Sequence, residues 1–115
     1  MKYEIAMQWA DALESGKYKQ GTEALRDVNN EYCCIGVLCD IAPGTKWLYR
    51  NDLYYVGQEN PTHASRHVKE WSGLKTDEGR IIFKKGSLSL IKLNDERKRS
   101  FKQIAAYIRR NWEKL

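Results

Sequence analysis

The sequence predicts an α+β fold: a small single domain that is mainly helical, with three or four helices and a short β-hairpin or small antiparallel sheet. Apolar residues recur at helical spacing near both ends of the chain, and an aromatic-rich stretch around Arg50-Asn51-Asp52 has the pattern of a hairpin. A length of 115 residues with 42% hydrophobic content suffices for one modest core. We therefore expect residues 1–115 to form one compact domain.

The first helix is predicted at about residues 2–14. Three apolar side chains share one of its faces, namely Ile5, Trp9 and Leu13. Gly16 follows where a left-handed residue can end a helix. The glycine-flanked stretch 15–21 then indicates a shaped loop, and Thr22 is expected to cap a short helical turn that contains Leu25.

The segment YCCIGVLCD, residues 32–40, contains all three cysteines. As a strand it would place alternate residues on one face, and as a helix it would be apolar nearly all round. We favour a buried helix that ends at Pro43-Gly44. In that helix Gly36 and Asp40 would form the one stripe that is not apolar.

The middle of the chain predicts a hairpin, a helix and a further strand. Residues 46–56 should form the hairpin. Asn60-Pro61 should open a helix that Gly73 closes, because Asn is a good cap and Pro suits the first helical position. Residues 80–83 could add a strand, with Lys85-Gly86 as its turn.

A capping box, Ser100 with Gln103, predicts the start of the C-terminal helix. Its apolar stripe consists of Phe101, Ile104, Ala105, Ile108 and Trp112. Residues 90–108 also look like the first half of a helix-turn-helix unit. A DNA-binding protein of this type would need a recognition helix after Ile108. Only seven residues remain there, so the likeness is weak.

The N-terminal sequence and the number of cysteines limit the cellular compartment and the partners that we expect. Glu4, Gln8 and Asp11 interrupt the N-terminal stretch, which therefore lacks the apolar run of a signal peptide, and no segment has the length of a bilayer span. An odd number of cysteines without such a signal argues against a disulfide framework. We expect a cytoplasmic protein with three reduced thiols and no membrane partner.

The net charge of +5 is unevenly placed. Residues 1–83 carry a charge of −2, whereas residues 84–115 carry +7. A basic end can bind nucleic acid or another anion, although a solvated helix face explains such charge more often. The candidate anion patch comprises Arg97, Lys98, Arg99, Lys102 and Arg109.

A metal site and a catalytic thiol are the next candidate functional sites. The cysteines and the two histidines offer zinc ligands, but no C-x-x-C pair is present, so we expect no metal and no cofactor. Cys33 or Cys34 could be a nucleophile at a helix start, with His63 or His67 as its base. Both histidines fall on a predicted helix, and small apolar thiols packed in a core explain the cysteines more simply.

A ligand pocket is the remaining candidate site. The glycine-flanked loop supplies donors that suit an anionic or nucleotide-like ligand, and the stripe on the cysteine helix would face it. The predicted ligand-binding residues are Lys17, Tyr18, Gln20, Tyr32, Gly36, Asp40, Asn94 and Asp95. Asp40 could alternatively cap a nearby loop through buried hydrogen bonds.

The order of motifs resembles a group of small uncharacterised proteins encoded by bacteriophages, prophages and some bacteria. The likeness covers nearly the whole chain. It is carried by W-x-x-A-L-x-S-G-x-Y-x-Q from Trp9, by the cysteine segment, by V-x-x-W-x-G-L from Val68, and by L-N-D with S-F-x-x-I-A from Leu93. The chain departs from the group at residues 96–99, where a basic stretch replaces a glycine-containing turn.

The resemblance implies a small accessory protein that acts by binding something of the host. We expect a non-enzymatic protein that neutralises a host component in the bacterial cytoplasm, either an antiviral defence protein or its nucleotide-like signal. A small cysteine-dependent hydrolase or transferase and a basic nucleic-acid-binding protein are the alternatives. Nucleic acid is a possible partner that the sequence does not favour.

Overall fold

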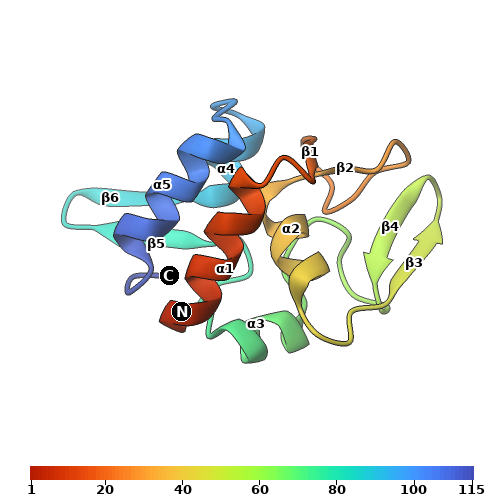
Figure 1. The fold of residues 1–115 in the computed structure, drawn as a ribbon, viewed down its shortest axis with the longest axis horizontal. Coiled ribbons are helices and arrows are strands. Elements are labelled where there is room, and N and C mark those ends of the chain that lie inside the picture. The colour runs from red at the N-terminus through yellow and green to blue at the C-terminus, as the bar shows by residue number, and fades with distance from the viewer.

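The computed structural model describes all residues, 1–115, as five helices and three two-stranded sheets (Figure 1). In chain order the elements are α1 (Tyr3–Glu14), β1 (Lys19–Gln20), β2 (Glu31–Tyr32), α2 (Cys34–Ile41), β3 (Trp47–Arg50), β4 (Leu53–Val56), α3 (Arg66–Ser72), β5 (Arg80–Phe83), β6 (Gly86–Ser89), α4 (Leu90–Asp95) and α5 (Phe101–Asn111). The α+β class is thus confirmed. No helix has the length and apolar character that crossing a membrane requires.

Helices α1, α2, α4 and α5 form the body of the molecule. α1 packs along α5 and against α2, and α4 packs against both α2 and α5. The chain ends lie close together, since the Met1 amino group donates to the Trp112 carbonyl oxygen at 3.3 Å. The two antiparallel hairpins extend from opposite sides of this body (Figure 1).

The sheets are small and independent of one another. β1 and β2 pair in parallel, whereas β3 with β4 and β5 with β6 pair antiparallel. Asn51 and Asp52 connect β3 to β4 with φ values of 54° and 62°, which is the positive-φ pair of a type I′ turn. The predicted hairpin is confirmed, as is the strand at residues 80–83. Its turn is formed by Lys84 and Lys85 and not by Lys85-Gly86, because Gly86 already pairs with Phe83 as the first residue of β6.

Helix α2 lies at the centre of the core. Its buried residues are Cys34, Ile35, Gly36, Val37, Leu38 and Cys39. Because almost no face of this helix meets water, neighbouring elements contact it from several directions. The indole Nε1 of Trp9 donates to the Cys34 carbonyl oxygen at 2.9 Å, and the main chain of Leu25 passes directly over Gly36.

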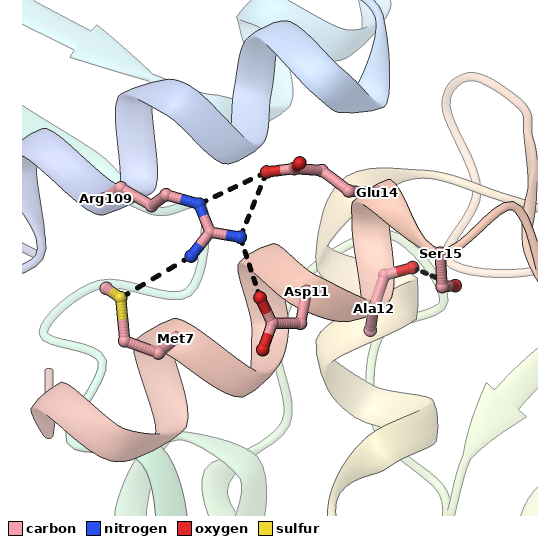
Figure 2. Close-up of polar contacts among 6 residues, drawn as sticks. All are labelled: Met7, Asp11, Ala12, Glu14, Ser15 and Arg109. Carbon is pink, nitrogen blue, oxygen red and sulfur yellow. Dashed lines mark hydrogen bonds and ion pairs between the residues drawn. The ribbon is translucent and has the colours of Figure 1, made fainter.

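Arg109 joins the two longest helices at the surface (Figure 2). Its guanidinium donates to Asp11 at 2.8 Å and to Glu14 at 3.0 and 3.2 Å, so one cation on α5 pairs with two carboxylates of α1. These side chains are partly exposed, and ion pairs in such positions stabilise folding by only about 0.2–1 kcal/mol. The α1–α5 contact therefore depends mainly on its buried apolar residues.

The capping box at Ser100 and Gln103 is confirmed, and so is the left-handed end of α3 at Gly73. The predicted start of α3 was wrong. The side chain of Asn60 accepts from the amide and hydroxyl of Thr62, which forms a local turn, and Ser65 caps the helix instead by accepting from Val68.

One further prediction was wrong. No helical turn follows Thr22, since Glu23 takes a left-handed φ of 72° and the chain then forms isolated bridges. The leucine-bearing helix that the helix-turn-helix likeness suggests from Leu90 is present as the six-residue α4. Ser89 caps α4 by accepting from the Lys92 amide, a signal that the sequence does contain.

The substitution Gly36→Ala tests how closely the main chain of Leu25 packs against α2. A Cβ at this position would overlap the Leu25 carbonyl oxygen and lie 2.6 Å from its carbonyl carbon. Because backbone must move to make room, we expect the free energy of unfolding to fall by about 3 kcal/mol in urea titrations. Gly44→Ala is the control, since nothing lies within 4 Å and only its φ of +77° opposes a side chain; it should cost about 1 kcal/mol. Equal costs for the two variants would show that the passage is not tight.

Candidate functional site

The three cysteines are all buried, and their thiols face the core. Cys33 caps α2 by accepting from the Gly36 amide at 3.4 Å, and Cys34 donates to the Leu90 carbonyl oxygen at 3.5 Å. Burial raises the pKa of Cys33 to about 12 and also raises the pKa of Cys34 and of Cys39. At neutral pH the thiols are therefore protonated and shielded, whereas a nucleophile must be an accessible thiolate.

Neither histidine hydrogen-bonds a thiol. His63 precedes α3, contrary to the prediction that both histidines lie on a helix, and its Nδ1 contacts the Thr62 hydroxyl at 2.6 Å. His67 lies on α3 and contacts the hydroxyls of Ser65 and Thr45 at 3.2 and 3.3 Å. No group of three or more His, Cys, Asp or Glu side chains has an arrangement that could hold a metal ion.

The carboxylate of Asp40 joins three segments. It accepts from the Tyr18 hydroxyl at 2.6 Å and from the Trp47 indole at 2.9 Å. The loop after α1 and the strand β3 are thereby tied to the end of α2. Burial and the hydrogen bond to Asp40 raise the pKa of Tyr18. The hydroxyl therefore keeps its proton, and remains a hydrogen-bond donor, at pH values where a tyrosine ordinarily ionises.

An aromatic cluster surrounds this carboxylate. Tyr32 lies edge to face against Tyr18 and against Trp47, with ring centroids 5.1 and 6.1 Å apart. The Arg26 guanidinium lies 3.9 Å from the ring centroid of Tyr54 and within 6 Å of the Tyr32 and Trp47 rings. Sequence reasoning missed Arg26, because its aromatic partners come from three different strands and no local pattern joins them.

Gln20 forms a second polar junction. Its side-chain nitrogen donates to Asn94 and to the Arg99 carbonyl oxygen, each at 2.8 Å, while its oxygen accepts from the Phe101 amide at 3.1 Å. Asn94 in turn donates to the Gly21 carbonyl oxygen and to Asp95. One glutamine thus joins the glycine-flanked loop to α4 and to the start of α5.

A groove of about 500 Å³ opens beside this junction, between the loop after α1 and the first turn of α5. Its lining residues are Leu13, Glu14, Gly16, Tyr18, Gln20, Ser100, Phe101 and Lys102. Glu14 is already paired with Arg109, whereas Lys102 and the adjacent exposed Lys17 make no ion pair. The rim of the groove therefore favours an anion.

The predicted ligand residues do not form one pocket. Tyr18 and Gln20 line the groove, whereas Lys17 is exposed and follows the lining residue Gly16 in the sequence without lining the groove itself. Tyr32 and Asp40 belong to the aromatic cluster, and Asn94 and Asp95 belong to the Gln20 junction. Gly36 is covered by the Leu25 main chain, so the space that it leaves admits backbone and not a ligand.

The predicted basic patch is also divided. Arg97, Lys98, Arg99 and Lys102 are exposed around the turn between α4 and α5. Arg109 lies farther along α5, where its charge is matched by Asp11 and Glu14. A smaller hollow of about 280 Å³ near Lys46, Glu59 and His67 was not predicted.

Alkylation with iodoacetamide tests the burial of the thiols. At neutral pH we expect no labelling of the native protein over a time that fully labels the same chain in urea, with intact mass as the readout. In urea all three cysteines should react. A single rapidly labelled thiol in the native protein would contradict the burial and favour a nucleophile.

The same burial predicts an alkaline loss of stability. The folded chain retains the thiol protons above the ordinary pKa of 9.0, whereas unfolded thiols ionise there. Since the folded state then binds more protons, the free energy of unfolding should be constant up to about pH 8 and fall from about pH 9 upward. Urea titrations at successive pH values measure this, and a flat profile through pH 10 would contradict it.

Substitution of Asp40 tests the junction of the three segments. Asp40→Ala leaves the Tyr18 hydroxyl and the Trp47 indole without an acceptor, and we expect it to lower the free energy of unfolding by about 2–3 kcal/mol. Asp40→Asn is the matched control, because its oxygen can accept from Trp47 while its amide donates to Tyr18; it should cost less than half as much. If the alanine variant were as stable as the parent, the junction would not contribute to folding.

Comparison with known proteins identifies a family without assigning an activity. No curated protein and no solved structure matches the chain. One family model, described as a domain of unknown function (DUF8296), matches residues 1–112. Because the match spans every helix and strand described above, the chain belongs to the DUF8296 family.

Proposed function

We propose that this chain is a non-enzymatic accessory protein of bacteriophage or prophage origin, which binds and neutralises a host component in the bacterial cytoplasm. Its origin is inferred from the resemblance carried by the Trp9–Gln20 stretch and the cysteine segment. The observation that carries the binding role is the groove between the loop after α1 and α5. Two of its lining residues, Tyr18 and Gln20, are among those that the sequence predicts for a ligand.

The chemistry of the groove suits a nucleotide-like signal. Tyr18 supplies aromatic surface for a base, with smaller contributions from the largely buried Leu13 and Phe101, and Lys102 supplies a cation for a phosphate. The amides at the start of α5 contribute less. Phe101 already donates to Gln20, and Gln103 donates to Ser100, so an anion would depend on Lys102 and Lys17.

The buried thiols favour a binding role over a cysteine-dependent enzyme. Protonated sulfurs at the core, without a histidine in contact, offer no route to a covalent intermediate. A host protein as the neutralised component is the other form of this proposal. In that form the same groove would receive an acidic side chain of the partner.

A ligand panel tests the nucleotide form. We expect one cyclic dinucleotide or ADP-ribose derivative at saturation to raise the melting temperature by about 5–10 °C. Lys102→Ala should remove most of this rise, whereas Lys92→Ala, which changes an exposed lysine on α4, should leave it intact. No rise with any member of the panel would overturn the nucleotide form and leave the host-protein form.

A further inference from the structure

The β5–β6 hairpin carries an exposed apolar tip that the proposed groove does not use. Ile82 is 69% exposed and Phe83 is 41% exposed, although both are large hydrophobic residues. They lie opposite Ser87 and Gly86 in the strand register, so no cross-strand apolar partner covers them. The hairpin extends beyond α5, on the side of the molecule opposite β3 and β4 (Figure 1).

The charge at this tip is of one sign. Residues 79–94 contain no acidic residue. Lys84 and Lys85 are exposed and make no ion pair, and the Lys114 ammonium lies 5.1 Å from the centroid of the Phe83 ring. At the base of the hairpin Arg80 is paired with Glu78, so the unmatched charge is concentrated at the end.

We propose that the tip of the β5–β6 hairpin binds the surface of an anionic lipid membrane, with Ile82 and Phe83 entering the headgroup region and Lys84, Lys85 and Lys114 contacting lipid phosphates. Lysines beside an anionic bilayer are attracted to it, and apolar side chains gain by leaving water at the interface. This contact needs no membrane-spanning segment, and it differs from the expectation, drawn from the sequence, that the protein has no membrane partner.

A lipid surface fits this tip better than nucleic acid does. Phosphates of a duplex would engage the lysines, but they would leave the most exposed apolar residue of the tip, Ile82, in water. A bilayer interface accepts both the apolar and the cationic groups at once. The inference is independent of the proposed function, because the groove is built from other elements.

Vesicle flotation with purified full-length protein tests the inference. We expect binding to vesicles of phosphatidylcholine mixed with phosphatidylglycerol and little binding to phosphatidylcholine alone. Ile82→Ser, and separately Lys84→Glu with Lys85→Glu, should each weaken binding by about tenfold or more. Circular dichroism and thermal melting establish that each variant is folded.

Two controls match these changes elsewhere on the surface. Leu48→Ser alters an exposed leucine, 47% accessible, on the other hairpin, and Arg97→Glu with Arg99→Glu reverses two charges in the turn before α5. Both should bind vesicles like the parent. The inference is overturned if anionic vesicles do not bind the protein, if Ile82→Ser binds as tightly as the parent, or if the Arg97 and Arg99 reversals are as damaging as those at the tip. Retention of a DNA duplex without vesicle binding would instead identify a nucleic-acid surface.

Discussion

The burial of α2 on nearly every side is the constraint on which the rest of the structure depends. A short helix without a solvent face must be enclosed by several elements at once, and its polar main-chain groups must still find partners. Trp9 of α1 donates to the Cys34 carbonyl oxygen, and Leu25 passes over Gly36. The Cys34 thiol reaches Leu90 at the start of α4. The cysteine side chains are small and Gly36 has none, which allows this enclosure. Larger groups at these positions would keep the surrounding segments from packing against α2.

The same burial keeps the thiols of α2 away from solvent and leaves the polar end of the helix for structural contacts. The sulfurs lie inside, where burial keeps them protonated, and the polar end of α2 is used to anchor its surroundings. Asp40 fixes the loop that carries Tyr18 and the hairpin that begins at Trp47. Gln20 fixes the same loop to α5. The groove between them is thus shaped by two anchored junctions, which is the kind of preorganisation that lowers the entropic cost of binding.

Local patterns in the sequence predicted most of the helices, the β3–β4 hairpin and the strand β5, because capping boxes, turn residues and apolar periodicity act over a few residues. They failed where a local hydrogen bond displaced a stronger-looking signal, as at Asn60, and after Thr22, where Glu23 takes a left-handed φ and no helical turn forms. The site was harder to predict. Tyr18 and Asp40 were both named, but their partner Trp47 was not, and Arg26 depends on rings from three strands. Such contacts join residues far apart in the chain, and periodicity carries no information about them.

Native-state hydrogen exchange measures the central role of α2 most directly. If the rest of the fold encloses this helix, the amides of Val37 and Leu38 can exchange only when the whole domain unfolds. Their exchange free energy should then equal the free energy of unfolding in urea, while the amides of β5 and β6 exchange through smaller openings. Exchange of the α2 amides at a lower free energy than those in the middle of α1 or α5 would contradict this role.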